Sequence, residues 1–307
     1  PNEEGYYGFG AAAEAKDIRS WRHYVRTLAI RYQGKINKWE LYNEPNAKLM
    51  FSGTPKVMAA MAREAWIQLK TIDPANVVVS PGIVTRTTNS PKWLDEYLNA
   101  GGARYADAIT AHFYVKAGER PEDTLRYLAI VRKIMADRGV GHLPLWNTES
   151  GYGRWNPQDR RTHEIYGGST SMAYVARTYV LMAASNVVRS YWYGWDQREF
   201  TGLFLTTNGY TAGPAGRAYG VMSGWLVGSR VHSCTVVMTG AIAGGYSCVV
   251  TKGRVQRRIL WHPTRSATLR IPAGYRSQHN LDGTKVVVRS GTPFTVGPVP
   301  VLISTSP

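Results

Sequence analysis

The hydrophobic positions of residues 1–228 follow two periods in turn. In longer segments apolar residues recur every three or four positions, as in 17–33, where Trp21, Val25 and Leu28 share one helical face. Between these segments lie short β-branched runs such as NVVVSPGIV at 76–84, which are typical of strands buried on both faces. The predicted helices are 17–33, 54–72, 90–99, 122–138, 169–187 and 214–227, and the predicted strands are 36–43, 76–84, 106–115, 142–150 and 187–195. Strands that alternate with helices predict βαβ units and a parallel sheet.

The pattern changes after Gly228. Residues 229–307 contain only short alternating runs separated by Gly, Pro, Asn and Asp, which predicts a small antiparallel, sandwich-like β-domain. Its predicted strands are 233–237, 245–251, 257–262, 267–272, 284–289 and 298–304. We therefore expect an α/β domain at 1–228 and a C-terminal β-domain at 229–307.

The chain is strongly basic. It has 307 residues and a formal charge of +16, from 37 basic and 21 acidic side chains, which permits binding to nucleic acid or acidic polymers. The densest basic cluster, Arg254, Arg257 and Arg258, is interrupted by uncharged residues, and no nucleic-acid-binding motif accompanies it. We therefore expect a solvated basic surface and no nucleic-acid partner. No apolar run reaches the roughly 18 residues of a membrane helix, so we expect no membrane partner either.

The two cysteines, Cys234 and Cys248, both fall in the strand-rich C-terminal region. Their spacing suits a disulfide that bridges a hairpin, which implies an oxidising compartment and a secreted or periplasmic protein. The alternative is a pair of reduced core thiols. The sequence opens with Pro1 and has no visible signal peptide, so we expect that an upstream segment was removed or lies outside this sequence.

Polar and aromatic residues gather where the predicted strands end. The carboxyl ends of parallel strands meet at one edge, where α/β proteins carry their chemistry. The residues at these ends are Asn43, Glu44, His112, Tyr114, Glu149, Trp192 and Trp195. Two carboxyl groups at one mouth suit glycoside hydrolysis, in which one donates a proton and the other attacks the anomeric carbon or activates water. The alternatives are that Glu44 is an exposed strand-end acid and that 43–46 is only a turn.

Four segments carry a resemblance to the clan A glycoside hydrolases. WELYNEPN at 39–46 resembles their fourth-strand signature, DAITAHFY the sixth strand, LPLWNTESGYG the seventh and YWYGWD the eighth. The sequence is most similar to family 39, with family 5 next, over residues 17–227. The resemblance implies a (β/α)8 TIM barrel and a retaining hydrolase of β-glycosidic bonds in oligo- or polysaccharides, with no cofactor and no metal.

The resemblance also implies a role for each strand-end residue. Glu44 would be the general acid/base and Glu149 the nucleophile, with carboxyl groups about 5 Å apart. We expect the negative nucleophile to raise the pKa of the acid. Asn43 would bind the sugar 2-OH, His112 and Tyr114 would line the pocket and orient the nucleophile, and Trp192 or Trp195 would form the sugar platform.

Glu40 competes with Glu44 for the role of acid. It lies four residues earlier, so strand alternation places it on the same side, but deeper. We expect Glu40 to be buried and paired with a basic residue or a hydroxyl.

The sequence departs from the family pattern at its start. A (β/α)8 barrel has eight strands, whereas the five predicted strands correspond to the fourth to eighth, so we expect an incomplete barrel with open edges. The first three strands, and the second-strand Arg that supports the nucleophile in the family, have no counterpart. Three explanations stay open: a fragment completed by another chain, a natural short barrel covered by residues 1–10, by loops or by a homo-oligomer, or a truncated upstream segment.

Two other functions compete with a retaining glycosidase. A non-catalytic carbohydrate-binding relative would keep the aromatic residues but would not need paired acids, and an acidic-glycan or nucleic-acid binder rests on the net charge alone. Family 39-like patterns imply β-xylosides or related pentosides, and family 5-like patterns imply β-glucans or mannans. We expect the β-domain to be a packing accessory, since Trp261 is its single candidate for an exposed sugar-binding aromatic residue.

Overall fold

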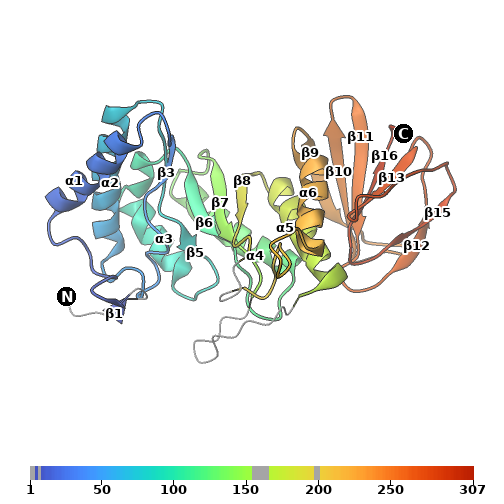
Figure 1. Ribbon diagram of the computed structural model, residues 1–307, viewed down its shortest axis with the longest axis horizontal. Helices are drawn as coiled ribbons and strands as arrows, with labels where there is room; N and C mark the ends of the chain where they lie inside the picture. Colours follow the sequence, from blue (N-terminus) through green and yellow to red (C-terminus); the bar gives the residue numbers. More distant parts are fainter. Residues whose placement is uncertain (1–3, 6–7, 154–165, 197–200) are drawn as a thin grey trace. The chain divides into compact units, whose positions relative to one another are not determined.

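A computed structural model describes residues 4–5, 8–153, 166–196 and 201–307 (Figure 1). The chain forms two compact units. The first comprises Pro1–Tyr114, Leu125–Ser150 and Val187–Tyr191, and the second comprises Val115–Thr124, Gly151–Asn186 and Trp192–Pro307. The expected domain boundary at 228/229 falls inside the second unit, and that boundary stays a prediction.

The first unit contains a parallel sheet with helices between its strands, as the alternating pattern predicts. Its helices are α1 (Ile18–Arg31), α2 (Pro55–Ile72), α3 (Ser90–Asn99) and most of α4 (Thr124–Asp137), with a 3-10 turn η1 (Gly102–Tyr105). Its strands are β3 (Lys38–Glu40), β4 (Val77–Val79), β5 (Ile83–Val84), β6 (Ile109–His112), β7 (Leu145–Ser150) and β8 (Val187–Trp192, of which Trp192 is assigned to the second unit). The short hairpin β1 (Glu4–Gly5) and β2 (Gly8–Phe9) lies outside the sequence predictions.

The strand pairing gives the order of the parallel sheet. β3 pairs with β4, and β5, β6, β7 and β8 are neighbours in that order. Single bridges from Asn43 to Gly82 and from Val79 to Ala108 join the two groups, so β4 and β5 act as one interrupted strand. Within the described residues β3 and β8 each have one neighbour, which leaves the sheet open at both edges.

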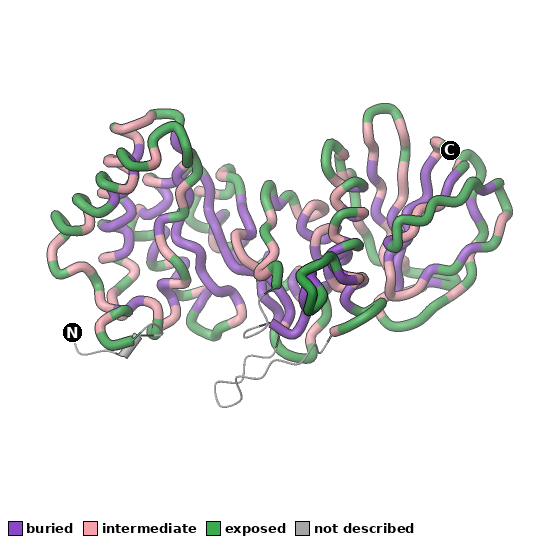
Figure 2. The backbone as a smooth tube through the Cα atoms, in the orientation of Figure 1, coloured by how far each residue is buried: buried purple, intermediate pink, exposed green. Residues whose placement is uncertain are grey.

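Burial explains why these segments form strands. Val78, Ile109 and Leu145 are fully buried at the centre of the sheet, as expected for strands covered on both faces (Figure 2). The helix ends follow the local sequence, because the Asp17 side chain accepts a hydrogen bond from the Arg19 backbone and Thr54 caps α2 ahead of Pro55. β3 is shorter than the predicted strand 36–43, because beyond Glu40 only isolated bonds to the 80–84 segment continue the pairing.

The second unit joins two helices to the C-terminal strands. It contains the 3-10 turn η2 (Pro121–Asp123), α5 (Gly168–Ala184) and α6 (Pro214–Leu226). Its strands are β9 (Arg230–Val236), β10 (Tyr246–Lys252), β11 (Val255–Trp261), β12 (Ala267–Arg270), β13 (Ser277–Asn280), β14 (Lys285–Val287), β15 (Pro293–Val296) and β16 (Val301–Ser304). They form an antiparallel six-stranded sheet in the order β14-β13-β16-β11-β10-β9 and a two-stranded sheet, β12-β15.

Two strands of this region were absent from the sequence prediction. β13 has the polar sequence SQHN, so it carries no apolar signal, although Ser277 is buried between its two partner strands. β15 does alternate, with Phe294 and Val296 buried, but it is only four residues long and begins with proline.

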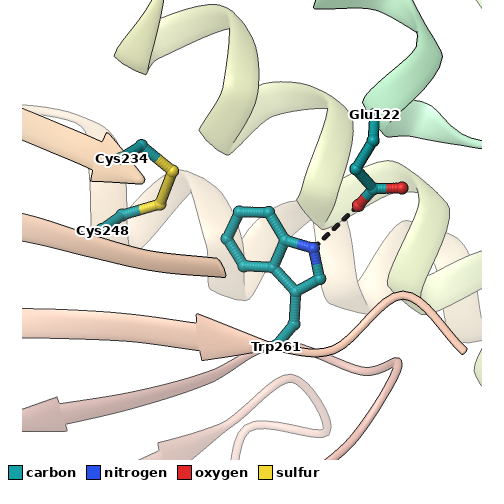
Figure 3. Close-up of a disulfide and its surroundings, with 4 residues drawn as sticks. All are labelled: Glu122, Cys234, Cys248 and Trp261. Atoms are coloured by element: carbon teal, nitrogen blue, oxygen red, sulfur yellow. Dashed lines mark hydrogen bonds between the residues drawn. A yellow bond between two sulfur atoms is a disulfide. The ribbon is translucent and has the colours of Figure 1, made fainter. Parts of the chain in front are cut away.

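A buried ion pair connects the β-strands of the second unit to its helical part. Cys234 and Cys248 form a disulfide between directly opposed residues of β9 and β10. The indole nitrogen of Trp261 donates to Glu122 Oε1 at 2.7 Å (Figure 3). The Arg177 guanidinium donates to both oxygens of Glu122. Trp261 is fully buried, so the expectation of an exposed aromatic residue here is wrong, and the role of the β-domain as a packing accessory stays a prediction.

We expect Arg177→Met to lower the free energy of unfolding by about 3–5 kcal/mol, because it leaves the Glu122 carboxylate without its counter-charge in a buried site. Urea denaturation measures this change. The double variant Arg177→Met/Glu122→Leu should recover part of the loss, since it removes both charges. A loss below about 1 kcal/mol in the single variant would mean that the pair resembles an exposed one.

None of the described helices combines the length and the apolar character that crossing a membrane requires.

Candidate active site

The segment after β3 forms a tight turn that presents Glu44. The backbone of Glu44 is left-handed, with φ of 46°, a strained conformation for a non-glycine residue. Its amide donates to the Gly82 carbonyl at 2.8 Å, and its carbonyl accepts from the Ala47 amide at 2.9 Å. The buried side chain of Asn46 donates to the Val84 carbonyl at 2.8 Å and accepts from the Val84 amide at 3.0 Å. The NEPN sequence therefore forms a turn, and this turn fixes the position of the Glu44 carboxylate.

His112, at the end of β6, connects the two glutamates. Its Nδ1 lies 2.9 Å from Glu44 Oε1, a hydrogen bond, and 3.8 Å from Glu149 Oε2. Tyr114 donates from its hydroxyl to Glu149 Oε1 at 2.7 Å. An oxygen of Glu44 and an oxygen of Glu149 lie within 4.8 Å of one another. The structure thus brings Glu44, His112, Tyr114 and Glu149 together, as the strand-end positions predict.

The charges of this cluster depend on burial and on one another. Burial alone would lower the pKa of His112, but the nearby carboxylates of Glu40, Glu44 and Glu149 outweigh it and raise this pKa to about 9. Burial raises the pKa of Glu149, and the charges of Glu44 and Glu40 add to that, while His112 and Tyr114 act in the opposite direction. Burial and the Glu149 charge also raise the pKa of Tyr114. His112 is therefore an imidazolium at neutral pH, placed between carboxylates.

Glu40 is not buried as expected. Its side chain is 30% exposed, because β3 is an edge strand in the described sheet. The expected hydroxyl partner is present, since Thr148 donates to Glu40 Oε1 at 2.8 Å. Thr110 Oγ1 lies 3.2 Å from the same oxygen but has a closer acceptor, the Ser80 carbonyl, at 2.7 Å.

The other predicted site residues have different surroundings. Asn43 is exposed and bridges to Gly82 through its backbone. Trp192 and Trp195 belong to the second unit. There the Trp192 ring packs against Tyr152 and Tyr179, at centroid distances of 5.9 and 6.3 Å, whereas 54% of Trp195 is exposed. Of the two, Trp195 offers the freer ring face.

Sequence patterns did not identify several residues that support the site. Asn147 is fully buried; it accepts from the Phe113 amide at 3.3 Å and donates to Ser150 and Ser190, both at 2.8 Å. The Arg86 guanidinium lies 4.7 Å from the centre of the Tyr114 ring, a cation–π contact. The position of Asn147, two residues before Glu149 on the same strand, was a usable signal. Nothing in the sequence placed Arg86 beside Tyr114.

The donor atoms of Glu44, His112 and Glu149 are the group in the described part of the chain that is compact enough to share one cation. A metal would have to displace the proton on His112 Nδ1. The negative charges of the surrounding carboxylates stabilise that proton. The hydrogen bonds from His112 and Tyr114 account for the arrangement, so we assign no metal to it.

Comparison with known proteins identifies the chain. The family model described as the glycosyl hydrolase catalytic core matches residues 17–219. The chain belongs to this family. It is therefore a glycoside hydrolase, and the resemblance to clan A is confirmed. No sequence of a curated protein matches this glycoside hydrolase.

Solved structures similar to this glycoside hydrolase are TIM-barrel enzymes. A monomeric β-xylosidase from Caulobacter crescentus CB15 has 15% identity and a TM-score of 0.65, with 99% of this chain and 78% of that chain covered. The GH39 enzyme from Xanthomonas axonopodis pv. citri has 17% identity, a TM-score of 0.62 and coverages of 99% and 76%. An α-L-arabinofuranosidase from Thermotoga maritima has 12% identity, a TM-score of 0.67 and coverages of 94% and 73%. These likenesses establish the fold, and the family 39-like prediction agrees with them.

We expect Tyr114→Phe to move the acidic limb of the pH profile of kcat/KM upward by about one pH unit. The Tyr114 hydrogen bond lowers the pKa of Glu149, so its loss raises that pKa, and Glu149 is then ionised only at higher pH. A hydrogen bond to a charged group contributes roughly 1.5–3 kcal/mol, and one pKa unit corresponds to about 1.4 kcal/mol. Tyr24→Phe, on the exposed side of α1, is the control and should leave the limb in place. An unmoved limb in Tyr114→Phe would contradict the argument.

Proposed function

We propose that this glycoside hydrolase cleaves β-glycosidic bonds with retention of configuration. The observation that carries the proposal is the closeness of two carboxylates, with oxygens of Glu44 and Glu149 within 4.8 Å of one another. Retaining enzymes hold their carboxyl groups about 5–5.5 Å apart, whereas inverting enzymes leave about 6.5–9.5 Å for a water molecule.

The hydrogen bonds of the cluster support a separate role for each carboxylate. Glu149 accepts from Tyr114 and faces the His112 imidazolium, and both contacts favour its charged form, while burial has the larger effect and leaves its pKa raised. In the first step Glu149 attacks the anomeric carbon while Glu44 gives its proton to the departing oxygen, and the glycosidic bond breaks. In the second step water gives a proton to Glu44, its oxygen bonds to the anomeric carbon, and the bond to Glu149 breaks.

We propose an oligo- or polysaccharide substrate of the β-xyloside class. Two observations support this proposal. The sequence has family 39-like motifs, and the similar structures include a β-xylosidase and an endoxylanase. In this proposal Asn43 contacts the sugar. For Trp192 and Trp195 the role of sugar platform stays a prediction. A preference for β-glucans or mannans, typical of the family 5-like alternative, is a possible result of the same test.

Hydrolysis of a panel of aryl β- and α-glycosides by the purified chain tests the proposal. We expect turnover of aryl β-xylosides, with the β-anomer of xylose as the first product seen by proton NMR. A first product in the α-configuration would exclude retention. Binding of xylo-oligosaccharides without turnover of any substrate would instead support a non-catalytic relative.

We also propose that the strands β3 to β8 correspond to the fourth to eighth strands of a barrel. Beside the unpaired edge of β3 lies a groove of about 240 Å³, lined by aromatic and apolar residues including Trp21, Trp39 and Tyr42. An exposed strand edge and an apolar groove favour a covered surface, and a homo-oligomer is one way to cover it. A monomeric mass in solution at working concentration would exclude the homo-oligomer.

The disulfide between Cys234 and Cys248 supports a secreted or periplasmic location, because such bonds persist in oxidising compartments. Recovery of the chain from the medium or the periplasmic fraction would test this location.

A further inference from the structure

Glu40 forms a second acidic contact to His112, opposite Glu44. Glu40 Oε1 lies 3.8 Å from His112 Nε2, and Glu44 Oε1 lies 2.9 Å from His112 Nδ1. The ring therefore has a carboxylate oxygen at each nitrogen. We infer that Glu40 is a positioning residue, which holds the His112 ring in one orientation with a proton on each nitrogen, so that Nδ1–H always donates to Glu44. This inference rests on the proposed role of Glu44 as acid/base.

The position of the Glu40 carboxylate is fixed by its own contacts. Its Oε1 accepts the Thr148 hydroxyl at 2.8 Å, and Thr148 lies in β7, one residue before Glu149. The same oxygen faces His112. Because Oε1 takes both contacts, this oxygen is directed at the ring, while the side chain as a whole is 30% exposed and borders a cavity of about 200 Å³ lined in part by Thr148 and Tyr191.

Gly82 provides the space for this contact. A Cβ atom at Gly82 would lie 2.1 Å from Glu40 Oε1 and 2.4 Å from His112 Nε2, far inside van der Waals distance. The backbone of Gly82 does not have a positive φ, so its conformation alone does not require glycine. Glycine at this position is therefore explained by the approach of Glu40 to His112.

The charges around His112 show why both contacts matter. The groups that face it are Glu40 and Glu44 from the β3 segment and Glu149 from β7. Beyond Glu149 the Tyr114 hydroxyl donates to that carboxylate, and the Arg86 guanidinium lies over the Tyr114 ring. The ring is 1% exposed, so without these carboxylates burial would favour its neutral form. A neutral ring has a single N–H, which could lie on Nε2 and leave Nδ1 as an acceptor facing the Glu44 carboxylate.

The fixed imidazolium has a defined effect in the proposed cycle. When Glu44 has given its proton to the departing oxygen, its new carboxylate charge is stabilised by the Nδ1–H of His112. Glu40 keeps the second proton on Nε2 throughout, so His112 neither gains nor loses a proton. Glu44 is thereby left as the group that exchanges a proton with the leaving group and with water.

The titration of His112 by NMR in histidine labelled with ¹⁵N tests the inference without any need for turnover. A His112→Gln variant assigns its signals among the seven histidines. We expect both ring nitrogens to stay protonated up to about pH 9 in the parent protein, and the pKa of His112 to fall by about one unit or more in Glu40→Gln, because one opposite charge at this range shifts a pKa by about 1–3 units. Gly82→Ala, which pushes the two groups apart, should act in the same direction.

The matched control is Glu64→Gln, which removes a carboxylate on α2 that pairs with Arg22 of α1 and should leave the titration of His112 unchanged. A fall of less than about one unit in Glu40→Gln would overturn the inference, as would a shift of equal size in Glu64→Gln. The pH profile of kcat/KM provides the functional arm, where we expect Glu40→Gln to lose activity at lower pH on the alkaline side. If the parent protein hydrolyses no substrate, the proposed function fails, and the NMR titration still decides the role of Glu40.

Discussion

Replacing Glu149 with glutamine is expected to lower kcat/KM on aryl β-glycosides by on the order of 10⁴-fold, the scale typical of the loss of a covalent nucleophile. The amide is nearly the same size and keeps an oxygen that can accept from Tyr114, so the fold and the hydrogen bond at 2.7 Å should survive. What is lost is the negative charge that attacks the anomeric carbon. Steady-state rates on a β-xyloside with a good leaving group measure the effect.

Replacing Glu149 with a residue that has a smaller side chain identifies its role more directly. Glu149→Gly opens space on the face from which the carboxylate attacks, so added azide can enter there, form its bond to the anomeric carbon and expel the aryl group. The product of a single displacement is the α-glycosyl azide. Glu96→Gln, an exposed acid on α3, is the control and should retain parent activity. If Glu149→Gln retained more than a tenth of the parent rate, Glu149 could not be the nucleophile.

The positions of the catalytic candidates could be predicted from sequence because they depend on local rules. Parallel strands end at one edge, so acids at the ends of two strands meet there, as Glu44 and Glu149 do. Residues two apart on the predicted strand 106–115 point to the same side, which predicted that His112 and Tyr114 lie together. In the structure β6 ends at His112, and both side chains still lie near Glu149. Neither rule requires knowledge of how far apart the strands are or what lies between them.

Contacts that depend on exact distances could not be predicted. The space above Gly82 exists only because Glu40 and His112 approach across it, and no pattern in the sequence gives that distance. The prediction that Glu40 is buried was wrong for a related reason. The exposure of a side chain on an edge strand depends on whether another strand covers that edge. The direction of the Trp192 side chain could not be predicted either, and its ring packs against Tyr152 and Tyr179.

The charge of Glu149 depends on groups that the sequence analysis did not weigh. The sequence argument considered only the acid, whose pKa a negative neighbour would raise, and that expectation stays a prediction. In the structure burial raises the pKa of Glu149, while His112 and Tyr114 lower it. If Glu149 is the nucleophile, as we propose, it needs groups that favour its charge, and the His112 imidazolium and the Tyr114 hydroxyl act in that direction. The stabilisation of the Glu149 charge by His112 and Tyr114 is more important here, because the second-strand Arg of the family has no counterpart among the predicted strands.

Replacing Glu44 with alanine is expected to have an effect that depends on the leaving group. For a β-xyloside with a poor leaving group, such as an unsubstituted alkyl or sugar oxygen, we expect kcat/KM to fall by about 10²–10⁴-fold, because proton donation to that oxygen is lost. For a dinitrophenyl xyloside, which departs without a proton, the first step should be nearly unchanged. The glycosyl-enzyme should then accumulate, since no base is left to activate water.

Azide separates this behaviour from that of the Glu149 variants. In Glu44→Ala, azide attacks the glycosyl-enzyme without needing a base, so it should restore turnover of the dinitrophenyl substrate and give the β-glycosyl azide after two displacements. Glu40→Ala is the informative comparison, because Glu40 touches the same histidine from the other side. If Glu40→Ala, and not Glu44→Ala, showed azide rescue and the dependence on leaving group, the acid/base role would belong to Glu40. Rescue in Glu44→Ala with an α-configured product would instead reverse the roles of Glu44 and Glu149.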